Sequence, residues 1–580
     1  MSSQSATRTL TRTTTVAAGA FAPGHLGGLT QFLPFELVDD ILEQTRTLQC
    51  RVRTLPSRVG SYFVLALGLF PGLGYQRVWD KLVAGLSGLD LRAPSETALR
   101  HLRKRLGPKP LELLFNVLAV PLARPSTPGV CYRRWRTVAF DGCNSLKAPD
   151  LPRIQALLGK VRHHWGMSGY PSLRLTVLCE TGTRGLLGAV FGPSEAGEII
   201  QASRLLPRLT PQMLLRADRA FDGDGFLGQV ADTGAQFLVR LSARRRPAVL
   251  AVLPDGSHLT RFHHVHVRVI DADITVTTSE GQIITGRYLL ATTLTDHRRD
   301  PADTLIRLYH ERGEIETAYY SLRHTLLTGR VLRSQDPRGL EQEVWSLLTL
   351  YQVLRMAMTQ AVESLPGADP DRASFTVALH AARDQVINAD HIVPEREDGT
   401  GLAVAIRSGL LPPRRARTSA RKVKCPTSRY PAHPPAGTPR TAKMSPASPL
   451  HFELSQPQPN PRGRADNATR SCRSCAPRPA APGTPTTSPQ PAGAPPATTA
   501  SASSSAAGPA KDSSTRSPTP PTRSPQPGCR PTFPSTNKAL DDVGPALTSW
   551  HCFNRLLGCL HHCLTHRIPY DERTAFPNTA

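Results

Sequence analysis

The spacing of apolar residues changes near residue 136, and this change constrains the fold more than any other feature of the chain. Four short apolar runs with strand character follow it, RTVAF, LRLTVLCET, RGLLGAVFG and QMLLRAD, and the helical pattern EAGEIIQASRLLPRL precedes the last of them. Further strand-like runs lie at 235–294, before a helical segment at 308–324. Strands that alternate with helices in this way predict an α/β domain with a β-rich insertion.

Upstream of this region the apolar residues recur with helical spacing. The segments LPFELVDDILEQ, SYFVLALGLF, YQRVWDKLVAGL and SETALRHLRKRLG predict a helical domain. In the last segment Ser95 is a suitable N-cap and Gly107 a suitable stop. The side away from its leucines is basic, and we expect DNA contacts there from Arg100, Arg103 and Lys104, although an ordinary solvated helix has the same pattern.

The net charge of the 580-residue chain is +25, and it is unevenly distributed. Residues 421–540 hold 16 Lys and Arg against 3 Asp and Glu, together with 26 of the 54 prolines. Such a composition buries too little apolar surface to offset the entropy of ordering, so we expect residues 431–545 to be disordered. The rest of the chain is still basic. This favours a polyanionic partner such as DNA, because Lys and Arg that neutralise phosphates release counterions.

Two acids follow apolar strands, Asp141 in TVAFDGCNSL and Asp218 in LLRADRAFDG, and we expect both at the rim of a sheet where a strand ends. A third acid, Glu316, lies in the helical segment. Phosphoryl transfer on DNA uses two divalent ions about 4 Å apart, one at the attacking oxygen and one at the leaving oxygen. Carboxylate oxygens suit Mg²⁺, so the three acids supply the minimum set of ligands.

The helical segment LYHERGEIETAYYSLRH carries three glutamates between two arginines. Laid on a helix, Glu316 lies on a polar face, whereas Glu311 and Glu314 point away from it, and we expect these two to be solvated. Beside Glu316 that face presents three residues suited to phosphate: Tyr309, Arg312 and Arg323. An ordinary Arg312–Glu316 ion pair on a solvated surface would have the same spacing.

These motifs resemble the DDE transposases of insertion sequences, and specifically the insertion element 4 family. The resemblance rests on DGCNSLKAPD, LLRADRAFDGDGFL, FLVRL and YHERGEIETAYYSLR. The last of these matches the family pattern Y-x2-R-x3-E-x6-K, with arginine in place of lysine. The resemblance implies an α/β fold with an RNase H-like catalytic core. It also implies that Asp141, Asp218 and Glu316 form the catalytic, metal-binding triad for two Mg²⁺ ions, which Mn²⁺ can replace.

The same resemblance implies an activity and partners. The chain would bind double-stranded DNA at the terminal inverted repeats of an insertion sequence, cleave it, and join the freed 3′-hydroxyl to target DNA. Tyr309, Arg312 and Arg323 would contact phosphate near the cleaved end. Because two ends must be joined, we expect a homodimer or a higher synaptic complex on DNA. The alternative is an inactive or repurposed transposase that acts as a sequence-specific DNA-binding protein.

Gly313 keeps this alternative open, because it stands where the family commonly has a tryptophan directly after the signature arginine. Related enzymes that pass through a hairpin intermediate stack a flipped base on tryptophan. No tryptophan lies between Asp218 and Glu316. A flipped base would therefore need Phe262 or Tyr288, although ordinary sheet positions for both fit the sequence as well.

The predicted organisation has six parts. They are a flexible N-terminus at 1–32, a helical DNA-binding domain at 33–130, a catalytic domain at 131–365 with its β-rich insertion at about 223–300, a helical and basic segment at 366–430, the disordered basic tail at 431–545, and a Cys/His-rich terminus at 546–580. The spacing in HCFNRLLGCLHHCLTH does not match a regular zinc finger, so zinc binding there stays open. The sequence contains no segment long enough to span a membrane, and we expect a cytoplasmic, nucleoid-associated bacterial protein.

Overall fold

The computed structural model describes residues 24–49, 55–86, 91, 93–163, 166–277, 283–311, 314–389, 401–413 and 450–454. The chain divides into two compact units, Met1–Arg478 and Pro479–Ala580, and every described residue belongs to the first. The predicted Cys/His-rich terminus and nearly all of the predicted basic tail therefore lie outside the described residues.

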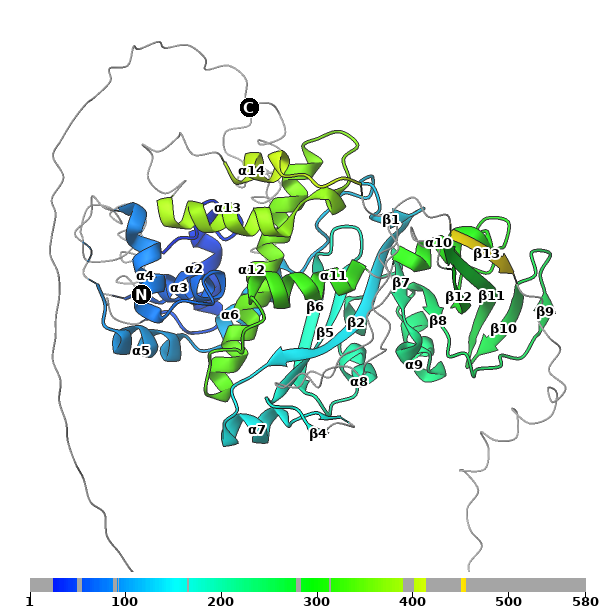
Figure 1. Ribbon diagram of the computed structural model, residues 1–580, viewed down its shortest axis with the longest axis horizontal. Helices are drawn as coiled ribbons and strands as arrows, with labels where there is room; N and C mark the ends of the chain where they lie inside the picture. The colour runs from blue at the N-terminus through cyan, green and yellow to red at the C-terminus, as the bar shows by residue number, and fades with distance from the viewer. Residues whose placement is uncertain are drawn as a thin grey trace, which may run out of the picture. The chain divides into compact units, whose positions relative to one another are not determined.

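The N-terminal part of the structure is a group of packed helices (Figure 1). Helix α3 is buried along its whole length, because α2, α4, α5 and the long helix α12 all contact it. In α5 the predicted cap is confirmed: Ser95 Oγ accepts a hydrogen bond from the Ala98 amide, and Gly107 ends the helix with a φ of 66°. The helices of this group are η1 (Leu29–Gln31), α2 (Phe35–Gln44), α3 (Ser57–Leu69), α4 (Tyr75–Val83), η2 (Ala84–Leu86), α5 (Glu96–Leu106) and α6 (Lys109–Leu118).

A large mixed sheet follows these helices in the chain. Its strands, in spatial order, are β6 (Leu186–Pro193), β5 (Ser172–Glu180), β2 (Trp135–Lys147), β7 (Met213–Ala217), β8 (Gln236–Arg240), β12 (Ile283–Thr292), β11 (Val265–Thr277), β10 (His258–Phe262) and β9 (Ala251–Val252). Strands β2, β7 and β8 are parallel to one another, whereas the other pairs in this order are antiparallel. Strand β1 (Cys131–Tyr132) pairs with β2, and β3 (Arg162–His163) forms a separate hairpin with β4 (Gly166–Met167).

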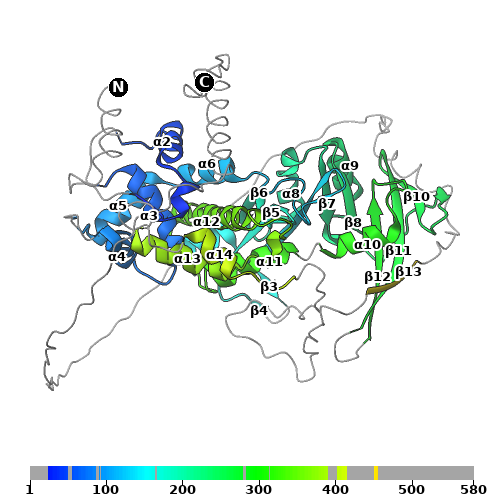
Figure 2. The same cartoon turned by 90° about the horizontal axis from the view of Figure 1, so that it is seen from above.

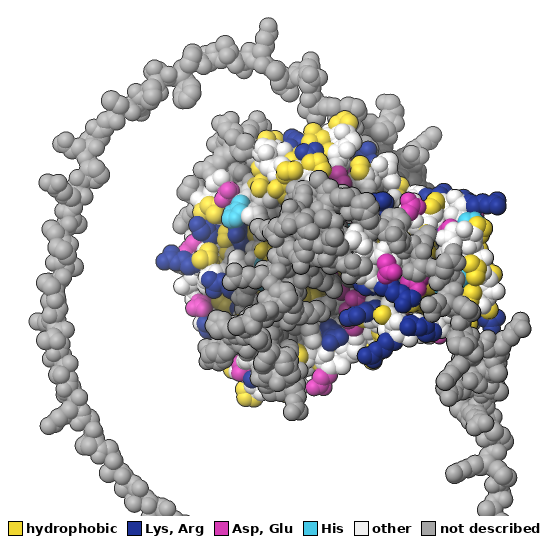
Figure 3. All heavy atoms as spheres, turned by 45° about the vertical axis from the view of Figure 1, so that its right-hand side comes forward, with side chains coloured by type: hydrophobic (Ala, Val, Ile, Leu, Met, Phe, Trp, Pro, Cys, Tyr) yellow, Lys and Arg dark blue, Asp and Glu magenta, His cyan; other side chains and the backbone are white. Residues whose placement is uncertain are grey.

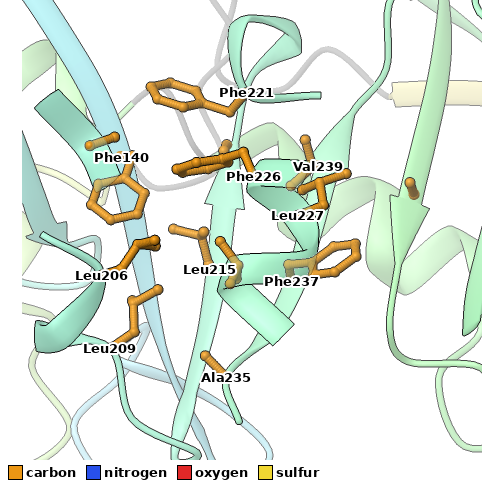
Figure 4. Close-up of a cluster of buried hydrophobic side chains, with 14 of the residues drawn as sticks. Phe140, Leu206, Leu209, Leu215, Phe221, Phe226, Leu227, Ala235, Phe237 and Val239 are labelled. Carbon is orange, nitrogen blue, oxygen red and sulfur yellow. The ribbon is translucent and has the colours of Figure 1, made fainter. Parts of the chain in front are cut away.

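Apolar side chains cover both faces of the central strands, as expected for strands that lie between two layers of helices. On one face the side chains of β2, β7 and β8 join those of α9 in a core cluster that includes Phe140, Phe226 and Phe237 (Figure 4). On the other face Leu214 and Leu238 pack against helix α10. Residues that alternate along β2 and β7 therefore point into different layers.

The helices around the sheet divide in the same way, and Figure 2 shows them from above. Helices α8 and α9 pack on one face, and α10 and α11 pack on the other. The remaining elements are α7 (Pro152–Leu158), α8 (Glu198–Ser203), η3 (Leu206–Arg208), η4 (Arg219–Phe221), α9 (Asp224–Asp232), α10 (Ala302–His310), α11 (Glu314–Tyr320), the π-helix η6 (Ser321–Leu326), α12 (Pro337–Glu363), η7 (Pro370–Arg372), α13 (Phe375–Asn388) and α14 (Leu402–Ser408). None of the described helices is both long and apolar enough to cross a membrane.

Strands β9 to β12 continue the edge of the central sheet. Strand β12 pairs with β8, with Leu290 opposite Arg240, so the two groups of strands share one hydrogen-bonded sheet. A further strand, β13 (Leu450–Leu454), pairs with β11 beyond the point where β10 ends. The prediction of disorder is wrong for these five residues. Their composition predicts no buried core, but their backbone groups form hydrogen bonds with the edge of β11.

Candidate active site

Two neighbouring parallel strands set Asp141 beside Asp218. In the β2–β7 ladder Ala139 lies opposite Arg216, and two more residues along each chain bring the two aspartates level. Adjacent strands are about 4.8 Å apart, and Asp218 keeps an extended backbone with φ −90° and ψ −178°. The residue before each aspartate points into the core cluster under α9. Both aspartates therefore point to the opposite face of the sheet, where α10 and α11 lie.

The prediction that both aspartates follow a strand end is right for Asp218 and wrong for Asp141. Strand β7 ends at Ala217, and the Asp218 carboxylate then accepts a hydrogen bond of 2.8 Å from the Ala220 amide. Strand β2 continues to Lys147, because it keeps its antiparallel partner β5 after its parallel partner β7 has ended. Asp141 thus lies in mid-strand, at the point where the parallel ladder stops.

Helix α11 carries the third acid over this face of the sheet. Tyr319 on α11 donates a hydrogen bond to the main-chain oxygen of Asp141 at 2.6 Å, and its hydroxyl also lies 3.3 Å from the main-chain oxygen of Leu175. Burial raises the pKa of Tyr319 well above its usual range, and the charge of Asp141 raises it further, so the hydroxyl remains a donor. Glu316, three residues earlier on the same helix, is exposed.

A buried arginine holds the beginning of α11. Arg184, in the turn between β5 and β6, donates through Nε to the Glu314 carboxylate at 2.7 Å, and its Nη2 also binds Asp371. The Arg184 side chain is only 4% exposed and that of Glu314 is 17% exposed. The prediction that Glu314 is solvated is therefore wrong. No periodic or spacing signal in the sequence marks Arg184, because its partners are far away along the chain.

A second buried arginine holds the end of α10. Arg216 on β7 donates to the main-chain oxygen of Leu308 and to the Thr181 hydroxyl, and it forms an ion pair of 3.6 Å with Glu311. Glu311 is thus also paired, contrary to the prediction that it is solvated. The two arginines fix the helical segment on both sides of residues 312 and 313, which lie outside the described residues.

Cationic side chains gather beyond the other end of α11. Arg323 and His324 lie in the π-helix η6, and Lys147 lies at the end of β2. Partial burial lowers the pKa of Lys147, and the nearby Arg323 charge lowers it further. Burial also lowers the pKa of His324, with smaller effects from the charges of Arg323 and Lys147. The three groups therefore share one electrostatic environment.

The signature residues differ in accessibility. Tyr309 is 4% exposed, and its ring packs edge-on against Tyr288 at 5.7 Å between centroids. The ring is thus covered in this structure, and the phosphate contact predicted for Tyr309 stays a prediction. Arg323 is partly exposed, and Arg312 lies outside the described residues.

In the N-terminal domain the predicted basic face of α5 is partly wrong. Arg103 is 7% exposed, and its guanidinium donates to Gln342 Oε1 at 2.7 Å, to Tyr75 Oη at 2.8 Å and to the Gly339 carbonyl at 2.7 Å. These bonds join α5 to α4 and α12, so they use the donors that DNA would need. Lys104 is exposed, and Arg100 is exposed with an ion pair to Glu96 at 2.7 Å.

The described residues do not gather the three acids into a metal-binding cluster. Within the described part of the chain, no group of three or more His, Cys, Asp or Glu side chains is close enough together to hold a metal ion. Strand register brings Asp141 and Asp218 together, and Glu316 does not complete the cluster. The oxygen ligands of these carboxylates are nevertheless the type that a hard divalent cation such as Mg²⁺ prefers.

Two family models match the chain. The model described as insertion element 4 transposase N-terminal matches residues 23–116, and the model described as transposase DDE domain matches residues 152–353. The second match includes Asp218 and Glu316, and it begins after Asp141. The two matches together span just over half of the chain and define a transposase with a DDE domain.

The chain belongs to the insertion element 4 family of transposases, as its motifs predicted. It is 26% identical over 424 residues to transposase InsG for insertion sequence element IS4 of Escherichia coli (strain K12), with 70% of this chain and 94% of the relative covered. Its structure is also similar to a chain in the cryo-EM structure of the piggyBac transposase synaptic complex with hairpin DNA. That similarity has a TM-score of 0.35 and 10% identity, covers 67% of this chain and 85% of the other, and supports no further argument.

Proposed function

We propose that this transposase binds the terminal inverted repeats of an insertion sequence and catalyses metal-dependent strand cleavage and strand transfer, which together give cut-and-paste transposition. The observation that carries this proposal is the β2–β7 register, which sets Asp141 beside Asp218 on the face covered by α11. Helix α11, which carries Glu316, packs on the same side of the sheet, so we propose that Glu316 joins the two aspartates when metal and DNA bind.

The arrangement of strands supports an RNase H-like core for this chemistry. Three antiparallel strands, β6, β5 and β2, are followed by β7 and β8, which are parallel to β2. This order places Asp141 on the central strand and Asp218 after the next one. We propose that the catalytic domain spans about 131–365 and that strands β9 to β12 form its insertion.

Asp141, Asp218 and Glu316 would hold two Mg²⁺ ions, or Mn²⁺ in their place. When bound, the ions supply activation of the attacking oxygen and stabilisation of the leaving oxygen. The backbone at Asp141 is held in place by the hydrogen bond from Tyr319 on α11. The Asp218 side chain is held by its hydrogen bond with the Ala220 amide at the start of η4. Glu316 depends on α11, whose first residue is held by Arg184.

Cations around this face would bind the phosphates of the DNA strand. We propose Arg312 and Arg323 for this role beside the carboxylates, and Arg100 and Lys104 on the N-terminal domain. The face shown in Figure 3 carries Lys and Arg side chains in groups, with acids between them. A chain with a net charge of +25 attracts DNA at long range, which also supports association with the bacterial nucleoid.

Transposition joins two ends of one element, so we propose that the protein acts as a homodimer or a higher synaptic complex on DNA. All three carboxylates are present in the sequence, and this favours an active transposase over the alternative of an inactive, DNA-binding relative. The two hypotheses differ in one outcome, which is whether the intact protein cuts the DNA that it binds.

The deciding experiment incubates the purified full-length protein with labelled duplex carrying the element's own inverted repeats, with Mg²⁺ or Mn²⁺. We expect nicking at the repeat end, and loss of nicking in Asp141→Asn, Asp218→Asn and Glu316→Gln with repeat binding retained. Asp303→Asn is the matched control, because Asp303 is an exposed acid on the neighbouring helix α10. Tight and specific binding without nicking by the intact protein would support the inactive alternative instead.

A further inference from the structure

Tyr320, the last residue of α11, exposes an aromatic ring beside the proposed active site. Its side chain is 62% exposed, and among the Phe, Tyr and Trp side chains whose exposure the structure describes, every other one is buried or partly buried. Tyr320 follows Glu316 by four residues, which is one helical turn and about 6 Å along the axis. Residues one turn apart lie on the same side of a helix, so the ring and the carboxylate face the same region.

The Tyr320 ring already has one stacking partner. The His324 ring lies 4.9 Å from it between centroids, with an angle of 32° between the two planes. Burial and the neighbouring charges lower the pKa of His324, so the imidazole is neutral at neutral pH. The pair therefore consists of two uncharged rings, tilted against each other, with the Tyr320 ring largely open to solvent.

The backbone that positions this pair is unusual. Helix α11 passes directly into the π-helix η6 (Ser321–Leu326), which contains His324. Helical segments of this type are rare and occur frequently at functional sites. The wider turn sets the next residues in a different direction from that of a continuous α-helix, and it is this segment that carries both His324 and Arg323.

Two cationic side chains lie near the ring pair. Arg323 and Lys147 both act on His324 electrostatically, and Lys147 Nζ lies 6.0 Å from the centroid of the Tyr170 ring. Proteins that bind single nucleic-acid strands combine an exposed aromatic platform for the bases with cations along the backbone. Paired duplex DNA has no free base face to offer, so the ligand that fits this combination is an unpaired nucleotide.

The two aromatic residues that the sequence left as candidates for a flipped base both lie in the sheet and have contacts of their own. Phe262 is 3% exposed and has the Arg245 guanidinium over its ring at 4.1 Å. Tyr288 has the Arg240 guanidinium over its ring at 4.4 Å and the Tyr309 ring against its edge. Phe262 is therefore covered, and Tyr288, which is partly buried, already has a guanidinium over its ring.

We propose that Tyr320, backed by His324, is a stacking site for an unpaired nucleobase next to the cleaved strand, with Arg323 and Lys147 binding the phosphates of that strand. The proposal rests on the proposed function, because the carboxylates define which strand is cleaved. It assigns a role to two residues, Tyr320 and Lys147, that the signature pattern does not include.

The test measures binding of the full-length protein, without divalent metal, to two duplexes that carry the inverted repeat. One is fully paired, and the other has its outermost base pairs mismatched and carries 2-aminopurine in the mismatched strand. We expect the wild type to prefer the mismatched duplex and to quench the 2-aminopurine fluorescence. Tyr320→Ala should lose about tenfold or more in affinity for the mismatched duplex, together with the quenching, whereas Tyr320→Phe should keep both.

Ile200→Ala is the matched control, because Ile200 is an apolar side chain of similar exposure, 61%, on helix α8. Equal loss in Tyr320→Phe and Tyr320→Ala would overturn the proposal, because the hydroxyl and not the ring would then matter. The proposal would also be overturned if Tyr320→Ala bound the mismatched duplex as tightly as the wild type. The same holds if this variant changed its oligomeric state and not its affinity for the mismatched duplex. If the wild type cuts repeat ends in Mg²⁺, a negative result for Tyr320 overturns the stacking site and leaves the proposed function intact. A wild type that neither prefers repeat DNA nor cuts it overturns the stacking site and the proposed function together.

Discussion

Arg184 binds Glu314 through Nε at 2.7 Å and binds Asp371 through Nη2, so one buried guanidinium ties α11 to the turn after β5 and to η7 near the end of α12. Glu314 is two residues before Glu316. We therefore propose that the ion pair sets the position of the exposed Glu316 carboxylate, with Arg184 and Glu314 as positioning residues.

We predict that Glu314→Gln lowers the nicking rate about 100-fold, because a displacement of about 1 Å at a reacting group has an effect of this size. Affinity for repeat DNA should change less than twofold, since Glu314 makes no proposed DNA contact. Arg184 keeps Asp371 as a partner in this variant, so the fold should persist. Single-turnover nicking and fluorescence anisotropy give the two values. A parallel loss of binding and nicking would indicate a general structural role instead.

Removal of divalent metal should abolish nicking and leave repeat binding intact. In the proposed complex, Lys and Arg side chains make most of the contacts to phosphate, and the metal ions make few. Dialysis against EDTA followed by addition of Mg²⁺ or Mn²⁺ tests recovery of activity. A thermal melt gives an independent readout: Mg²⁺ should raise Tm in the wild type, and not in Asp141→Asn or Asp218→Asn. Nicking by the metal-free protein would contradict the assignment of the carboxylates.

Arg103 and Lys104 are adjacent basic residues with different predicted effects. Arg103→Ala should lower the free energy of unfolding by about 3 kcal/mol, because it leaves buried acceptors on α12 without a donor. Lys104→Ala should leave stability unchanged within about 0.5 kcal/mol and weaken DNA binding, since its side chain is exposed. Urea denaturation and repeat-binding assays on both variants separate the two roles. Equal destabilisation by both changes would refute this distinction.

His25 should make stability depend on pH. Burial lowers its pKa to about 4, with a smaller opposing effect from the hydrogen bond to the Leu82 carbonyl, which lies 2.6 Å from Nε2. Its Nδ1 accepts from the Gly27 amide at 3.2 Å, so the neutral ring is satisfied on both sides. The unfolded chain takes up a proton below about pH 6.5, and the folded chain does so only near pH 4.

The unfolded state therefore binds more protons between these values, and stability falls as pH drops from about 6.5 to about 4. The loss should reach about 3 kcal/mol at the lower end. In His25→Gln this part of the pH dependence should disappear, although the variant is less stable at pH 7. Urea denaturation at pH 7.5, 6, 5 and 4.5 measures both curves. Parallel curves for the two proteins would show that another group is responsible.

Some of the site could be predicted from local patterns. The apolar runs before Asp141 and Asp218 and the spacing of Tyr309, Arg312 and Glu316 are visible in the sequence, and they led to the correct family. The Ser95 cap was predictable for the same reason: its partner, Ala98, is three residues away. Interactions of this kind depend on neighbours in the chain.

Other parts of the site could not be predicted in this way. Glu311 and Glu314 have the spacing of solvated residues, and the arginines that pair with them lie 95 and 130 residues away in the sequence. Arg103 has the pattern of an exposed cation, yet its acceptor Gln342 is 239 residues away. Hydrophobic periodicity predicts which side of a helix is buried. It does not predict which polar groups from distant segments will pair with the residues of that helix.

The sequence by itself determined the family and the order of helices and strands, and it supplied the three candidate acids, because these follow from short-range spacing and residue chemistry. The tertiary structure alone decided that β2 continues past Asp141, that two buried arginines hold the helical segment around residues 312 and 313, and that Tyr320 exposes its ring beside His324. The first two depend on pairing between segments far apart in the chain, and the third depends on the change from α-helix to π-helix after Tyr320; hydrophobic spacing encodes neither.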